Sequence, residues 1–152
     1  MTYRGIRLEA LATDPGAFGS KLAREQAFTE AEWRGRLAAR TAFVAFTSGE
    51  PTGLAAGIVD DDGVAQLVAM WVRPAARGAG IAGGLIGAVV SWAASTGRPR
   101  IRLWVVDGNV AAERAYLKAG FQLTGRRQPV REGEPVMEFE MARATSLPRQ
   151  TA

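Results

Sequence analysis

Apolar residues occur along the chain in short runs, and the turn-forming residues glycine, proline and aspartate separate these runs. Apolar runs of this length, bounded by turn residues, are typical of β-strands. The sequences Ser-Gly-Glu-Pro at 48–51 and Asp-Asp-Asp-Gly at 60–63 predict hairpin turns between consecutive strands. The expected strands lie at residues 3–10, 42–46, 54–59, 64–72, 101–106, 121–125 and 136–142.

Helix start and stop signals lie between several of these runs. Asp14 and the proline after it predict a helix over residues 16–28, with Asp14 as its N-cap. Thr29 and Glu32 have the spacing of a capping box, so a second helix is expected to begin there and to run through Leu37. Two further helices are expected over residues 80–95 and 110–119, and a glycine ends the second of them.

The order of these elements predicts an α/β fold in one domain. An antiparallel meander comes first, and strand–helix–strand crossovers follow it, so the sheet is expected to be mixed. We expect the domain to cover residues 1–144 and residues 145–152 to form a flexible tail.

A stretch without a charged residue lies between Arg77 and Arg98 and contains the pair Gly83 and Gly87. This glycine spacing marks the contact face of some membrane helices. The strongly apolar part covers only residues 81–94, which is shorter than the roughly 20 residues that cross a bilayer. We therefore expect a helix whose small residues pack closely on the sheet. Because the first ten residues do not resemble a secretory signal, we expect a cytoplasmic protein without a membrane partner.

The chain has 152 residues and contains neither cysteine nor histidine. These absences exclude disulfides, Cys or His metal sites, a cysteine nucleophile and a histidine base, and no metal is expected. The net charge is +4, and all basic residues except Lys21 and Lys118 are arginine, which favours bidentate contacts with phosphate or carboxylate. Because the basic residues are scattered along the chain, we expect no nucleic-acid partner.

A glycine-rich segment from Arg77 to Gly83 joins a predicted strand to a predicted helix. Glycine lets the backbone approach an anion, and the N–H groups and dipole of the first helical turn attract one. Arg77 adds a formal charge. The segment lacks both the Gly-Lys-Ser/Thr of P-loops and the acidic residue of dinucleotide-binding folds. Tight packing of the helix on the sheet is the alternative explanation of the small residues.

Two motifs in this half of the chain resemble those of the Gcn5-related N-acetyltransferase (GNAT) family. The family's R/Q-x-x-G-x-G/A turn is matched by Arg77, Gly80 and Ala82. The family's Asn…Ala…Tyr…Gly-Phe helix is matched by Asn109, Ala112, Tyr116, Gly120 and Phe121. The resemblance covers about residues 64–121 in the right order and spacing. It implies the GNAT fold, a central mixed sheet of about seven strands with about four helices.

The resemblance implies an enzyme that uses acetyl-CoA as its cosubstrate. The pyrophosphate would lie on the glycine-rich turn, and the pantetheine arm would follow the strand at 64–72, which must splay from the strand at 101–106. A backbone N–H at Met70 or Trp71 would polarise the thioester carbonyl. The residues expected to bind the cosubstrate are Met70, Trp71, Val72, Arg77, Gly78, Ala79, Gly80, Ile81, Ala82, Gly83, Asn109, Ala112 and Tyr116.

Tyr116 is the catalytic residue that the resemblance implies, as the general acid that protonates the departing thiolate. A thiolate with a pKa of about 8.5 can take a proton from a phenol near 10 when charge builds on sulfur. The alternative is a tyrosine whose ring only packs in the core.

The general base is left open by the sequence. Family members often carry a Glu or Asp on the strand before the glycine turn, where this chain has Gln66, which can orient a water but cannot accept the proton. Glu25, Glu30 and Glu32 are the other candidates, and each is alternatively a solvated helix charge. Removal of the amine proton by a chain of waters, without a dedicated base, is equally compatible with the sequence.

These observations favour an N-acetyltransferase that acts on a primary amine of a small molecule by direct attack in a ternary complex. A non-catalytic acyl-CoA sensor and an enzyme for protein N-termini or lysines are the alternatives. Phe18, Phe28 and Trp33 are expected either to line an acceptor pocket or to belong to the core. The final strands could pair across a two-fold axis in a homodimer.

Overall fold

A mixed six-stranded sheet organises the computed structural model, which describes residues 2–18 and 20–146. The predicted α/β class is confirmed. The helices are α1 (Thr2–Thr13), α2 (Leu22–Gln26), α3 (Glu30–Ala38), α4 (Ile81–Ser95) and α5 (Val110–Lys118), with short 3-10 turns η1 (Pro15–Ala17) and η2 (Pro74–Ala76). The strands are β1 (Thr41–Thr47), β2 (Glu50–Val59), β3 (Ala65–Val72), β4 (Arg100–Val106), β5 (Gln122–Pro129) and β6 (Met137–Ala144).

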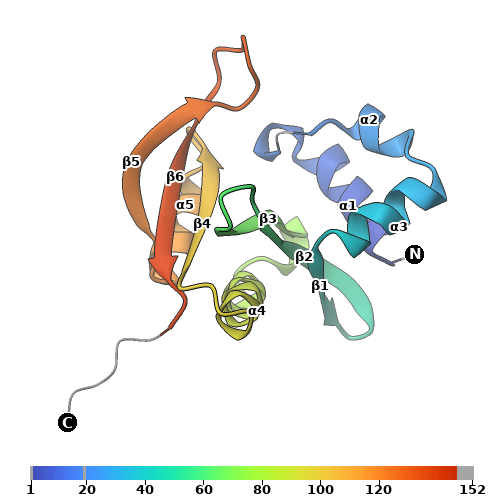
Figure 1. Cartoon of the computed structure of the whole chain (residues 1–152). Helices are drawn as coiled ribbons and strands as arrows, with labels where there is room; N and C mark the ends of the chain where they lie inside the picture. The colour runs from blue at the N-terminus through green and yellow to red at the C-terminus, as the bar shows by residue number, and fades with distance from the viewer. Residues whose placement is uncertain (1, 19, 147–152) are drawn as a thin grey trace.

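The sheet consists of two antiparallel halves that meet at one short parallel contact. Its strand order is β1-β2-β3-β4-β6-β5, and the crossover through α4 joins β3 to β4. The β3–β4 ladder pairs only Ala65 with Ile101 and Gln66 with Arg102. Beyond this point the two strands separate, and Figure 1 shows β1–β3 on one side of the opening and β4–β6 on the other. The splay expected between these strands is therefore present.

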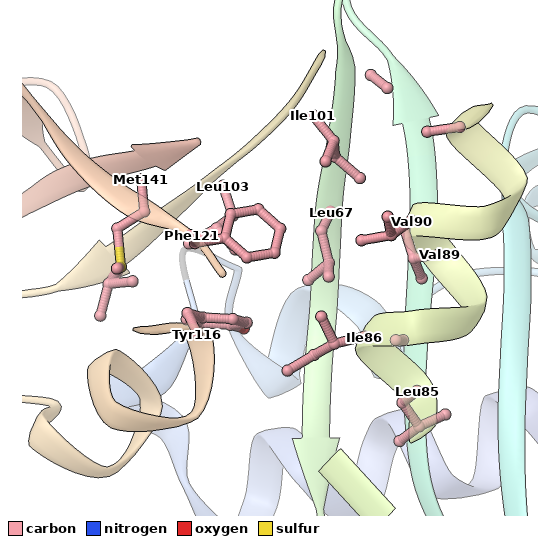
Figure 2. Close-up of a cluster of buried hydrophobic side chains, with 14 of the residues drawn as sticks. Leu67, Leu85, Ile86, Val89, Val90, Ile101, Leu103, Tyr116, Phe121 and Met141 are labelled. Atoms are coloured by element: carbon pink, nitrogen blue, oxygen red, sulfur yellow. The ribbon is translucent and has the colours of Figure 1, made fainter. Parts of the chain in front are cut away.

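Side chains of the central strands alternate between two separate apolar clusters, as the two-residue period of a strand requires. Leu54 and Trp71 belong to a cluster under α1 and α3, which cover one face of the first sheet half. Ala55 and Val72 belong to a larger cluster with α4, α5 and the second half. In Figure 2, Ile86 of α4 points toward the side where Tyr116 and Phe121 lie.

The expected strand at residues 3–10 is wrong, because this segment lies within α1. The residues that α1 buries recur at intervals of three and four, which is the period of a helix rather than of a strand: Tyr3, Ile6, Arg7, Ala10 and Leu11. The sheet consequently has six strands in the described residues instead of about seven. The helix expected over 16–28 is likewise divided into η1 and α2, whereas the capping box of Thr29 and Glu32 is confirmed at the start of α3.

The close packing expected at Gly83 and Gly87 is also wrong. Both glycines are exposed, and a Cβ added to either would meet nothing within 4 Å. The tight contact comes from the sheet instead, since a Cβ on Gly57 of β2 would lie 2.3 Å from the ring of Trp92. No helix among the described residues is long and apolar enough to cross a membrane.

The C-terminal segment expected to be a tail begins with an anchored residue. Thr145 is buried, its N–H donates to the carbonyl of Pro99 at 3.0 Å, and its hydroxyl donates to that of Arg98 at 2.5 Å. Residues 147–152 of the expected tail lie outside the described residues.

Candidate active site

A bulge in β3 lies beside the opening of the sheet. The register between β2 and β3 shifts between Leu54 and Ala56, so that Ala69 and Met70 stand opposite the single residue Ala55. Ala69 has a φ of 59°, a left-handed conformation that is uncommon for residues other than glycine. Such bulges redirect a strand. Here the bulge separates two cavities, since Ala69 lines one and Met70 lines the other.

The first of these, the tyrosine cavity, has a volume of about 320 Å³ and lies between the end of β3, α4 and α5. Small and apolar side chains dominate its wall, with Asn109 and Tyr116 as polar groups on the α5 side. Most of the residues expected to hold the cosubstrate arm gather here, namely Met70, Trp71, Val72, Arg77, Ala82, Asn109, Ala112 and Tyr116.

Tyr116 reaches this cavity from the buried face of α5. Asn109 starts that helix, because its side-chain oxygen accepts a hydrogen bond from the N–H of Ala112 at 3.2 Å. The Tyr116 ring packs edge to face on Phe121, with 5.9 Å between the centroids. Burial raises the pKa of the Tyr116 phenol above its ordinary value. The phenol consequently stays protonated at any physiological pH and can act as a hydrogen-bond donor.

A second cavity, the glycine cavity, has a volume of about 490 Å³ and is bounded by the loop before α4 and the end of α5. Gly78 and Gly80 both have positive φ, of 89° and 82°, which explains why glycine occupies these positions. Gly80 is the N-cap of α4 and offers no side-chain cap to the first turn. Of the predicted loop residues, Arg77, Gly78, Gly80, Ile81, Ala82 and Gly83 line the cavity, whereas the exposed Ala79 does not.

Sequence reasoning missed Lys118, whose side chain lines the glycine cavity from the last turn of α5. It was visible beside the Tyr116 motif as one of only two lysines in the chain.

Asp14 links the N-terminal helices to the glycine-rich loop, and sequence reasoning assigned it another role. Its side chain caps no helix. Instead, its Oδ2 accepts hydrogen bonds from the indole N–H of Trp71 at 2.7 Å and from Nη2 of Arg77 at 2.8 Å. The bond from Trp71, together with that from Arg77, holds the pKa of Asp14 below its ordinary value. No local sequence signal joins residues that are 63 positions apart.

A third cavity, the arginine pocket, has a volume of about 310 Å³ and lies on the other side of the β3 bulge. Ala17 lines both this pocket and the tyrosine cavity, so the two cavities adjoin there and at the bulge. The polar side chains of the pocket come from five segments of the chain, and they are Arg7, Arg36, Arg40, Gln66 and Glu138. Phe18, one of the predicted aromatics, lines the pocket as well, whereas Trp33 is fully buried in the core.

The carboxylates proposed as bases from sequence have other roles. Glu25 is fully buried and forms salt bridges with Arg7 and Arg36. Burial raises its pKa, but the hydrogen bond and charge of Arg7, with the charge of Arg36, outweigh this effect and leave the pKa below its ordinary value. Glu30 is exposed and pairs with Arg34, and Glu32 completes the capping box of α3. None of the three lines a cavity described above.

Glu138 of β6 is a carboxylate of the arginine pocket that sequence reasoning missed. It pairs with Val106 of β4 across the sheet, and its Oε1 accepts a hydrogen bond from Nε2 of Gln128 at 2.8 Å. Burial raises the pKa of Glu138, and the bond from Gln128 opposes the rise. A carboxylate with a raised pKa is a stronger base than a solvated one, so Glu138 is a candidate proton acceptor beside this cavity. Its position in the predicted strand 136–142 did not reveal which cavity it would reach.

Comparisons with known proteins match the chain to one family. A model of the acetyltransferase (GNAT) family matches residues 6–121. An uncharacterized N-acetyltransferase of Mycobacterium bovis is 34% identical over 88 residues, which are 58% of this chain and 56% of that protein. The chain thus spans about half the length of this relative.

Solved acetyltransferases share the fold. The yncA acetyltransferase of Salmonella typhimurium, solved with its cofactor acetyl-CoA, has a TM-score of 0.71 at 19% identity and covers 96% of this chain and 88% of its own. A Bacillus anthracis structure in complex with acetyl coenzyme A has a TM-score of 0.62 at 20% identity, and the match covers 69% of this chain and 62% of that one. Because the family model spans most of the residues here, and includes both motifs that resemble it, the chain belongs to the acetyltransferase (GNAT) family.

Proposed function

We propose that this protein is an N-acetyltransferase that transfers the acetyl group of acetyl-CoA to a primary amine of a small molecule, by direct attack in a ternary complex. The observation that carries the proposal is the meeting of two cavities at the β3 bulge, one lined by Tyr116 and the other by Glu138. A candidate proton donor and a candidate proton acceptor therefore line neighbouring cavities on the two sides of the bulge.

The residues around the tyrosine and glycine cavities fit acetyl-CoA. The glycine-rich loop and the start of α4 suit a pyrophosphate, and the charges of Arg77 and Lys118 add to the attraction. The apolar tyrosine cavity suits the pantetheine arm, and Asn109 can donate to it. Beyond Gln66 the edge of β3 is not paired with β4, so its backbone N–H groups can bind the arm and the thioester carbonyl.

Acetyl-CoA supplies the acetyl group as a thioester. We assign to Glu138 the removal of a proton from the amine nitrogen, which then forms a bond to the carbonyl carbon as the carbon–sulfur bond breaks. Tyr116 donates its hydrogen to the sulfur that leaves, and the second proton, which the nitrogen loses as the amide forms, returns to the Tyr116 oxygen. Glu138 releases the first proton to solvent. Burial raises the pKa of the phenol, which keeps Tyr116 protonated but makes it a weaker acid, so the transfer depends on the negative charge that develops on sulfur. The products are an amide and free CoA.

The acyl-CoA sensor was suggested by the lack of a carboxylate at Gln66, and Glu138 in the same pocket weakens that reason. Protein N-termini and lysines are the alternative acceptors, and the assay below includes peptides to test them.

The proposal also includes a cytoplasmic location and a homodimer. The two copies would pair through β5, the exposed strand at one end of the sheet.

Calorimetry with acetyl-CoA, followed by an assay of free CoA release with a panel of amines and peptides, tests the proposed function. We expect saturable binding and thiol release with small amines. Binding without release for every acceptor would support the sensor, release with peptides alone would support a protein acetyltransferase, and no binding at millimolar acetyl-CoA would refute the proposal.

A further inference from the structure

Three arginines line the arginine pocket, and the two nearby carboxylates, Glu25 and Glu138, do not balance all of their charge. Arg7 donates to both oxygens of Glu25, from Nε at 3.0 Å and from Nη2 at 3.1 Å. Arg36 shares the same carboxylate, with Nη1 at 3.3 Å from Oε1. Arg40 forms no salt bridge within the part of the chain that the structure describes. Three guanidinium groups thus surround one pocket, and a single buried carboxylate serves two of them.

Each of these guanidinium groups retains a buried N–H without a partner. Arg7 Nη1, Arg36 Nε and Arg40 Nε are inaccessible to solvent and form no hydrogen bond. The Arg7 side chain is only 5% exposed. Arginine cannot lose its proton to avoid this cost, and unsatisfied buried donors are unusual in folded proteins. Together with the uneven charge balance, these unpaired donors show that the described contacts leave the three guanidinium groups incompletely neutralised, and a bound anion would balance their charge.

Aromatic rings hold two of the guanidinium groups in place. Arg7 lies over the ring of Phe18 at 4.7 Å, and Arg36 lies over the ring of Phe28 at 5.5 Å. Burial lowers the pKa of Arg36; the charge of Glu25 opposes this, and the charges of Arg40 and Arg7 add to the lowering. A rigid group of mutually repelling cations is preorganised for an anion, because little ordering remains to be done on binding.

From this we infer that the acceptor is a small amine that carries a carboxylate or another oxyanion, and that Arg36 and Arg40 bind this anionic group. The inference rests on the proposed function and specifies its acceptor. With the anion at the arginines, the amine lies toward the β3 bulge, where the pocket adjoins the tyrosine cavity and where Glu138 can accept its proton. An α-amino acid and an aminophosphonate both have this chemistry.

The test compares the L-amino acids with their α-amides, and glycine with aminomethylphosphonate. Thiol release gives kcat and KM for each compound, and calorimetry gives the Kd of the same compounds with the CoA-saturated protein. Arg40→Gln is the informative variant, because Arg40 forms no salt bridge with any residue in 2–18 or 20–146 that the substitution would break. Arg34→Gln is the matched control, since Arg34 lies on α3 but its side chain is 72% exposed.

We expect at least one acid to exceed its amide in kcat/KM by tenfold or more. Arg40→Gln should reduce this preference by on the order of tenfold to a hundredfold, mainly through KM, whereas Arg34→Gln should leave it unchanged. Arg40→Lys keeps the charge without the planar fork and should have an intermediate effect. The glycine and aminomethylphosphonate arms decide which oxyanion is preferred.

Two results would overturn the inference. One is equal kcat/KM for acids and amides, and the other is a preference for acids that Arg40→Gln does not change. Binding of an acid that depends on Arg40 but yields no thiol release would instead refute the proposed function and support the anion site. If none of these anionic compounds bound or reacted, the anion site would be overturned. The proposed function would still be upheld if the protein bound acetyl-CoA and released thiol with other amines.

Discussion

The cosubstrate side of the site and the arginine pocket are built in opposite ways. The tyrosine and glycine cavities are lined largely by two contiguous segments, the loop into α4 and the helix α5, with small side chains and exposed backbone. The arginine pocket takes its polar groups from α1, α3, the turn after it, β3 and β6, and these groups are charged or amide side chains. Backbone N–H groups and helix dipoles can bind the cosubstrate that a whole family shares, because they do not depend on particular side chains. Side chains from separate segments can be exchanged one by one, so they can adapt the pocket to a particular acceptor.

The largest expected effect tests the proton donor of the cosubstrate side. Tyr116→Phe should lower kcat on the order of a hundredfold or more, because the departing sulfur loses its hydrogen-bond donor, and should leave the Kd of acetyl-CoA unchanged. Tyr3→Phe is the matched control, since Tyr3 is the only other tyrosine and lies in the opposite apolar cluster. Unchanged turnover in Tyr116→Phe would assign the phenol to core packing alone.

A stability measurement tests whether the arginine pocket depends on its buried ion pair. Glu25→Gln should lower the free energy of unfolding by about 3 kcal/mol, because Arg7 and Arg36 would then be buried without their carboxylate. Glu30→Gln removes an exposed pair on α3 and should cost less than about 0.5 kcal/mol in the same urea titration.

The buried ion pair of Glu25 with Arg7 and Arg36 also makes the free energy of unfolding depend on pH. The pKa of Glu25 is lower in the folded than in the unfolded protein, so its contribution is present above the unfolded pKa and is lost as the pH falls toward the folded value. Acid titration of Glu25→Gln should lack this part of the loss. If Glu25→Gln and Glu30→Gln were equally stable at neutral pH, this result would contradict a stabilising role for the buried ion pair of Glu25.

The pH profile tests Glu138 as the proton acceptor. A base must be ionised, so kcat/KM should rise with pH through the raised pKa of Glu138, and Glu138→Gln should lower the plateau by about a hundredfold and remove this limb. Gln128→Ala removes the hydrogen bond that lowers this pKa, so the limb should move to higher pH. The charged groups that share the pocket, Arg7, Arg36 and Arg40, remain unchanged in both variants. A limb that keeps its position in both variants would belong to the acceptor's own ammonium group.

The smallest expected effect tests whether the left-handed backbone at Gly80, the N-cap of α4, requires glycine. Gly80→Ala places a side chain in a left-handed conformation, which should cost about 1 kcal/mol of stability and weaken acetyl-CoA binding at the glycine cavity. Gly87→Ala is the control, because this glycine is helical and open, and alanine should stabilise it by up to about 1 kcal/mol. Equal melting temperatures would indicate that the conformation at Gly80 imposes no constraint.

Sequence reasoning succeeded where the signal was local. The capping box of Thr29, the strands from β1 to β6 and the loop at Gly80 follow from neighbouring residues, and the family motifs follow from fixed spacings. It failed for residues 3–10, where a helical period was taken as a strand although Tyr3, Ile6 and Ala10 carried it. It also failed at Asp14, because the hydrogen bonds from Trp71 and Arg77 are long-range and overrode the local capping preference.

By itself the sequence determined the α/β class and predicted the cosubstrate loop and Tyr116 as site residues, and its lack of cysteine and histidine excluded their chemistry. Tertiary structure decided the rest. It placed Glu138 and three arginines around one pocket, and it buried Glu25 as the counterion of Arg7 and Arg36 instead of leaving it free as a base. The physical reason is that backbone conformation and helix starts depend on adjacent residues, whereas burial and ion pairing depend on which distant segments the sheet brings together.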